Sequence, residues 1–122
     1  MANDFKRFTK PDVGTSTGAS ADAVYTVPAG SGSSALESIV IGITLANKTA
    51  SGITASVFLD NYDATNDVYI IKDATIPAGS SLEVMSGNKI VVQNNGTTGD
   101  VLRVSASSGP SLDATITVLE DV

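Results

Sequence analysis

Apolar residues alternate with small or polar ones along residues 38–47, SIVIGITLAN. Because successive side chains of a strand point to opposite faces, this pattern predicts a strand with one apolar face. No segment of the chain carries apolar residues at a period of 3.6 over the length of a helix. The chain must therefore build its core from strands. The residues expected to share one face of this strand are Ile39, Ile41, Ile43 and Leu45.

Seven other segments have the same character, with short alternating runs bounded by Gly, Pro, Asn and Asp. The predicted strands are residues 22–27, 38–47, 52–60, 68–73, 81–85, 89–93, 101–106 and 112–120. Short strands at this spacing predict an all-β fold, an antiparallel β-sandwich of about eight strands, of which a jelly roll is one form. The pattern does not set the order of the strands.

Length, charge and composition exclude several classes of function. The chain has 122 residues, the size of a single domain. Its formal net charge of -6 predicts no nucleic-acid partner, because binding phosphates needs clustered Lys and Arg. No run approaches the roughly 18 to 20 apolar residues of a membrane span, so we expect no membrane partner. Without Cys or His, the usual thiol nucleophile and imidazole base are both missing, and we expect no enzyme.

The N-terminus differs from the rest of the chain. Residues 1–12, MANDFKRFTKPD, hold three of the seven basic residues, and residues 13–21 are small and polar. This composition predicts an arm and a flexible hinge over residues 1–21, followed by a single β-sandwich domain over residues 22–122. We interpret the arm as a docking element, with a charged tail or an additional edge strand as the alternatives. Its docking residues are Phe5, Lys6, Arg7, Phe8 and Lys10, whose cations we expect to pair with an acidic neighbouring subunit.

The polar segment DNYDATND at residues 60–67 offers oxygen ligands of the kind that calcium takes. The candidate metal ligands are Asp60, Asp63 and Asp67. An EF-hand loop that began at Asp63 would need Gly and Glu where Val68 and Ala74 stand. We therefore favour a solvated hairpin loop and no cofactor, with a calcium site as the alternative.

Carbohydrate binding is a further candidate function, because sugar-binding modules are commonly β-sandwiches with exposed aromatic rings. Aromatic residues are 5% of this chain and Trp is absent. Tyr25 and Tyr69 lie in predicted strands, where cross-strand packing is expected. Tyr62 is then the one tyrosine left to contact a sugar.

Several phrases of the sequence, FKRFTK, VYTVPAG, VIGITLAN, IIKDATIPAGSSLEV and TVLED, resemble small virion structural proteins of tailed bacteriophages, especially marine and cyanobacterial ones. The resemblance implies a β-sandwich present in many copies on the particle, as a capsid decoration (head accessory) protein or as a neck or tail component. It implies no catalytic residues. The expected partners are the major capsid protein or neck and tail proteins, together with further copies of the chain in a trimer or another ring.

The expected location is the virion, after assembly in the bacterial cytoplasm. A glycan-binding adhesion module at the host-contact end of a fibre or tail is the alternative.

Overall fold

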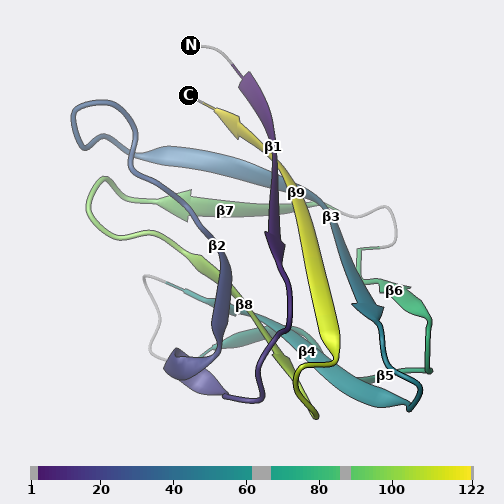
Figure 1. Cartoon of the computed structure of the whole chain (residues 1–122). Helices are drawn as coiled ribbons and strands as arrows, with labels where there is room; N and C mark the ends of the chain where they lie inside the picture. The colour runs from purple at the N-terminus through teal and green to yellow at the C-terminus, as the bar shows by residue number, and fades with distance from the viewer. Residues whose placement is uncertain (1–2, 62–66, 86–88, 122) are drawn as a thin grey trace.

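The computed structural model describes residues 3–61, 67–85 and 89–121, and Figure 1 shows the course of the chain. The described residues form nine strands and one short 3-10 turn. In chain order these are β1 (Asn3–Lys10), η1 (Gly18–Ser20), β2 (Asp22–Thr26), β3 (Leu36–Asn47), β4 (Ile53–Asp60), β5 (Val68–Ile76), β6 (Ser81–Glu83), β7 (Ile90–Asn94), β8 (Val101–Ala106) and β9 (Leu112–Asp121). Among these residues, no helix is long and apolar enough to cross a membrane.

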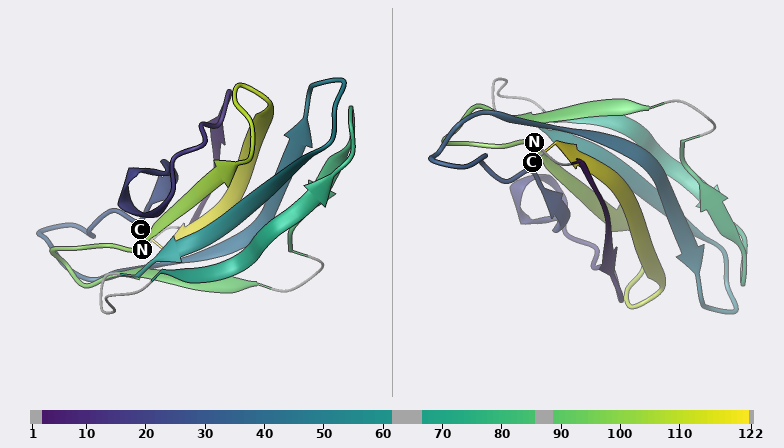
Figure 2. Two further views of the ribbon diagram at one scale, coloured as in Figure 1. Left: turned by 90° about the horizontal axis from the view of Figure 1, so that it is seen from below. Right: turned by 90° about the horizontal axis from the view of Figure 1, so that it is seen from above.

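The strands form two antiparallel sheets. Sheet A has the order β1-β9-β3-β6, with β7 paired to the other half of β3, and sheet B has the order β2-β8-β4-β5. The first strand therefore pairs with the last, the second with the eighth, and β4 with β5 at the centre of the chain. This nested pairing is the topology of a jelly roll, and it confirms the predicted antiparallel β-sandwich. Figure 2 shows the two layers from below and from above.

The core lies between the two sheets and consists of aliphatic side chains from both. Ile43 and Ile116 from sheet A and Val57 and Val104 from sheet B have no exposed surface. Fully burying a side chain of this size contributes about 1.5 to 3 kcal/mol to the free energy of folding. The sandwich is thus held together by its inward faces, and any function must be carried by the outward faces and the loops.

The faces of β3 differ from the prediction. Val40, Ile43 and Leu45 have no exposed surface, whereas Ile39 and Ile41 are only half-buried. The cause is a β-bulge, because the register against β9 shifts between Val40 and Gly42 and leaves one extra residue in β3. An extra residue reverses which side chains point inward beyond it. Ile39 and Ile41 therefore lie on the outer face of sheet A.

The N-terminal residues pack on the sandwich. Residues 3–10 form β1, the edge strand of sheet A, so of the three interpretations of this segment the structure shows the additional edge strand. Residues 13–21, for which the composition predicts a flexible hinge, contact the sandwich in this structure. Val13 has no exposed surface and its N–H donates to the Leu112 carbonyl at 2.8 Å, while the Ala106 N–H donates to the Gly14 carbonyl at 3.1 Å. These contacts, which are distant in sequence, hold a segment whose composition alone predicts disorder.

Candidate functional site

Two side chains of β1 point toward the interior of the same chain. The Phe8 ring lies 4.6 Å from the Tyr25 ring, measured between centroids. The Lys6 ammonium lies 2.8 Å from Oε1 of Glu120, whose side chain is 2% exposed. Within the chain, Lys6 is therefore paired with a carboxylate of its own β9, and the expected pairing of Lys6 with a neighbouring subunit stays a prediction. Burying a carboxylate is costly unless an opposite charge lies beside it. The Lys6 ammonium is the opposite charge for the buried Glu120 carboxylate.

The Glu120 carboxylate also accepts a hydrogen bond from a residue of β2. The Tyr25 hydroxyl donates to Oε2 of Glu120 at 2.6 Å and lies 2.8 Å from the Ser38 hydroxyl. Oε1 has no hydrogen bond of good geometry among the described residues, so the Lys6 ammonium is its compensating charge. Burial raises the pKa of Tyr25 well above its usual range, and the bond to Glu120 adds to this shift. The neighbouring Glu120 carboxylate also raises the pKa of Lys6.

The other arm residues point away from the core or lie at the end of β1. Phe5 is 76% exposed, and Arg7 is exposed on the same face of the strand. Lys10 is half-buried and lines a hollow of about 220 Å³ together with Asp113. Phe5 and Arg7 are thus accessible on the outer face of sheet A, and Lys6 keeps 44% of its side-chain surface exposed beside Glu120. The docking role of all five residues stays a prediction.

Phe5 is one end of an apolar line across sheet A. It lies opposite Leu119 in β9, Leu119 lies opposite Ile39 in β3, and Ile39 lies opposite Val91 in β7. Directly paired residues of neighbouring strands share a face of the sheet. Leu119 and Ile39 are half-buried, and Val91 is 55% exposed. We call these four residues the sheet A row.

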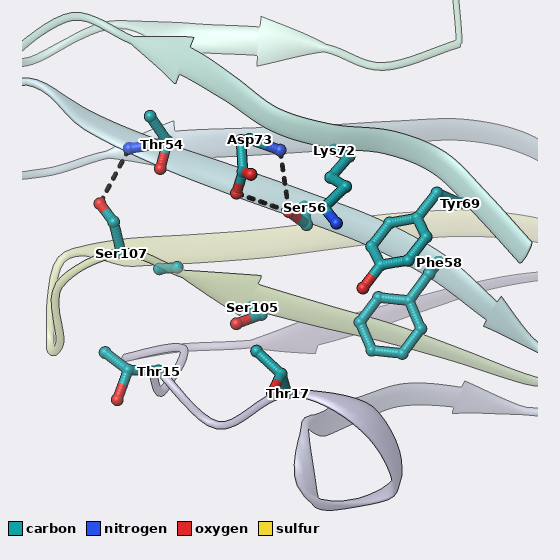
Figure 3. Close-up of a pocket in the computed structure, with 11 residues that line it drawn as sticks. Thr15, Thr17, Thr54, Ser56, Phe58, Tyr69, Lys72, Asp73, Ser105 and Ser107 are labelled. Atoms are coloured by element: carbon teal, nitrogen blue, oxygen red, sulfur yellow. Dashed lines mark hydrogen bonds between the residues drawn. The ribbon is translucent and has the colours of Figure 1, made fainter. Parts of the chain in front are cut away.

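Sheet B carries a groove on its outer face (Figure 3), with a volume of about 440 Å³. We call it the sheet B groove. Its floor includes Phe58, Ser56 and Ser105, which point outward from β4 and β8 and are nevertheless 0%, 8% and 7% exposed. The residues that line it are Thr15, Thr17, Thr54, Ser56, Phe58, Tyr69, Lys72, Asp73, Ser105, Ala106 and Ser107.

Irregular backbone in β5 forms one wall of this groove. The register of β5 against β4 shifts on both sides of Ile71, so that β5 carries one extra residue at each place. Between the two shifts Ile70 and Ile71 both pack against the core, and Tyr69 and Lys72 are exposed. Asp73 has a positive φ of 50°, a conformation that Asp tolerates better than most residues. Bulges of this kind re-aim side chains and commonly lie beside functional sites.

The opposite wall comes from the segment that precedes β2. Thr15 and Thr17 face the groove from this segment (Figure 3). The segment is tied to β8 at its far end, where Nη1 of Arg103 donates to the Ala21 carbonyl at 2.9 Å. Residues far apart in the sequence therefore form the two walls, and both walls are anchored to the same sheet.

The candidate calcium ligands are only partly described. Asp60 accepts a hydrogen bond from Nε of Arg103 at 3.0 Å, and its side chain is 36% exposed. Asp67 is half-buried, whereas Asp63 and Tyr62 lie outside the described residues. In residues 3–61, 67–85 and 89–121, no three acidic residues are grouped as metal ligands would be. The calcium site stays an untested alternative, and Asp60 already has a cation as its partner.

The sequence prediction missed Lys72, Asp73 and the serines and threonines of the groove. It assigned Tyr69 to cross-strand packing, and the Tyr69 ring does lie 5.1 Å from the Phe58 ring of the paired strand. Tyr69 is also 41% exposed, which the pattern did not indicate. The one available signal was the doublet Ile70-Ile71, which interrupts the alternation and marks a bulge.

Comparison with known proteins adds no family to these observations. No protein-family model and no curated protein matches the sequence. The functional proposals therefore rest on the residues, on their geometry and on the sequence segments that resemble phage virion proteins.

Proposed function

We propose that this protein is a non-enzymatic structural protein of a bacteriophage virion, a capsid decoration protein that assembles on the particle through the outer face of sheet A. The observation that carries the proposal is the sheet A row, a continuous apolar line that ends on Phe5, which is 76% exposed. An exposed apolar line of this kind on a small acidic domain favours a contact with another protein.

The residue types around the row support a protein partner. Aromatic residues and Arg are enriched where binding energy concentrates in interfaces, and Phe5 and Arg7 lie two positions apart on one face of β1. Strand β1 also holds them rigidly, because it is paired with β9 along its whole length. A rigid anchor loses less conformational entropy on binding than a disordered arm does.

The phage-like phrases of the sequence supply the biological setting. They favour a subunit present in many copies, with the major capsid protein as the partner and a trimer or another ring as the form in which the chain attaches. A neck, tail or fibre component is the second position that the same phrases allow. In either position sheet A would face the particle and sheet B would face outward.

The proposal is tested with two matched substitutions on β1. Phe5→Asp places a charge in the row, and Thr9→Asp places the same charge on the same face of the strand outside the row. Both variants should keep the wild-type far-ultraviolet circular dichroism spectrum. The Phe5→Asp protein should be largely absent from purified particles, and light scattering should show the free protein as a monomer. The Thr9→Asp protein should behave as wild type in both measurements.

Equal occupancy of wild type and Phe5→Asp on particles would contradict the proposal. Complete absence of the wild-type chain from particles of the phage that encodes it would also do so. If both variants lose assembly equally, the outer face of β1 is sensitive to charge in general, and the row is not the contact.

A further inference from the structure

We propose that the sheet B groove binds a neutral saccharide residue. Its volume of about 440 Å³ lies within the roughly 300 to 1,000 Å³ typical of small-molecule sites. Its walls are fixed by the bulges of β5 on one side and by the anchored segment before β2 on the other. The hollow is therefore part of the fold, present before any ligand arrives.

Three side chains of the β5 wall present polar groups to this space, as Figure 3 shows. The Tyr69 hydroxyl is directed toward the middle of the groove, and the Lys72 ammonium lies 5.1 Å from the centroid of the Tyr69 ring. The Asp73 carboxylate has one weak contact among the described residues, at 3.5 Å to the Ser56 hydroxyl. The stronger bond at this position runs from the backbone N–H of Asp73 to the same hydroxyl, at 2.9 Å.

The combination of these groups favours a ligand without a net charge. Lys72 donates only, Asp73 accepts only, and the surrounding hydroxyls do both. An anionic ligand would meet the charge of Asp73, and a cationic ligand would meet that of Lys72. A purely apolar ligand would leave these groups without partners. A neutral ligand with adjacent hydroxyls satisfies the donor and the acceptor together, and this is the chemistry of a sugar.

The aromatic residues of the groove suit the same ligand. Tyr69 is 41% exposed, and its ring packs against the fully buried Phe58. A sugar ring has an apolar C–H surface beside its hydroxyls, and Tyr likewise combines an apolar body with a polar tip. The groove therefore offers one apolar contact at a fixed position and a set of hydrogen-bonding groups around it.

Binding in the groove is independent of assembly through sheet A, because the two surfaces are on opposite layers of the sandwich. Each can fail while the other holds. If the protein does assemble in many copies, each copy adds a site, and a weak single-site affinity becomes useful through multivalency.

The test is a titration of the isotope-labelled full chain, followed by amide resonances in NMR. The probes are glucose, galactose, mannose, maltose and lactose, with glucuronic acid and glucosamine as charged counterparts. We expect at least one neutral sugar to shift the resonances of the groove at millimolar concentration, and to do so at lower concentration than the charged sugars. No shift with any neutral sugar, or a clear preference for either charged sugar, would overturn the proposal.

Three variants locate the site. Asp73→Asn keeps a residue that tolerates the positive φ and removes the charge, and Tyr69→Ala removes the ring. Each should weaken binding at least tenfold with an unchanged amide spectrum elsewhere. Val68→Ala is the matched control, since Val68 is 50% exposed in the same strand and does not line the groove. If Val68→Ala lost as much sugar binding as Tyr69→Ala, the sugar would bind elsewhere and the proposal would be contradicted. The same would follow if neither Asp73→Asn nor Tyr69→Ala lost sugar binding.

Discussion

The two outer faces of the sandwich carry aromatic residues in opposite ways. On sheet A, Phe5 stands out from an edge strand with 76% of its surface exposed. On sheet B, Phe58 also points away from the core and has no exposed surface, because Tyr69 and the neighbouring segments cover it. The comparison teaches that an outward-facing residue need not be a surface residue. Sheet A leaves Phe5 exposed at the surface, whereas on sheet B other residues of the same chain cover Phe58 and form a groove.

The largest expected effect on the free energy of unfolding is the difference between truncating Phe58 and truncating Phe5. Phe58→Ala should lower the free energy of unfolding by about 3 to 5 kcal/mol, the usual cost of removing a fully buried aromatic ring. Phe5→Ala should change it by about 0.5 kcal/mol or less, as is usual for exposed positions. Urea denaturation measures both. Similar losses in the two variants would mean that Phe5 and Phe58 do not differ in their contribution to stability.

A smaller effect is expected where β1 and β9 meet. Tyr25→Phe removes the donor to Glu120 and the partner of Ser38, and leaving buried polar atoms unpaired costs about 1 to 3 kcal/mol. Tyr69→Phe is the control, because its hydroxyl is directed into the open groove, and its free energy of unfolding should stay within about 0.5 kcal/mol of wild type. If Tyr25→Phe were as stable as wild type, the buried network would contribute nothing to holding β1.

Alkaline pH should give the smallest effect, and it acts on the same network. The folded state raises the pKa of Tyr25 above 10.0 and that of Lys6 above 10.5. A group whose pKa is raised by folding contributes stability that is complete below its unfolded pKa and is lost as pH rises through its folded pKa. The free energy of unfolding should therefore fall as pH rises above about 10, as denaturation at a series of pH values would measure.

The fall with pH should be shallower in Tyr25→Phe, because this variant lacks the contribution of the Tyr25 hydroxyl. A stability that rises through this window, or a slope that is identical in the two proteins, would count against the proposed linkage.

The period of two was sufficient to predict the fold class, because alternate residues of β4, β8 and β9 pack into the core. It failed in β3, where Val40 and Ile41 are both apolar and either register would bury an aliphatic face. Only the bulge against β9 decides that Ile39 lies outside. For residues 3–10 the pattern left a docking arm, a charged tail and an edge strand open, because the strand that decides between them, β9 with Glu120, lies near the other end of the chain.

The two candidate sites also differ in whether neighbouring residues of the sequence indicate them. The sequence indicated Phe5 and Arg7 because an aromatic-basic cluster is a local signal. It did not indicate the sheet B groove, whose walls meet only through pairings of β5 with β4 and of residues 13–21 with β8 and β9. Serines and threonines are common on the outward faces of strands, and nothing in their local pattern distinguishes Ser56 or Ser105 as a groove floor.

A reconstruction of intact particles, with the chain located in its density, tests the central claim most directly, namely that the two faces have different partners. We predict that the outer face of sheet A contacts a neighbouring subunit, with Phe5 buried in that contact and Tyr69 open to solvent on the outward side. Density in which the sheet B groove is covered by the shell while Phe5 lies in solvent would contradict the account, as would particles that lack the chain altogether.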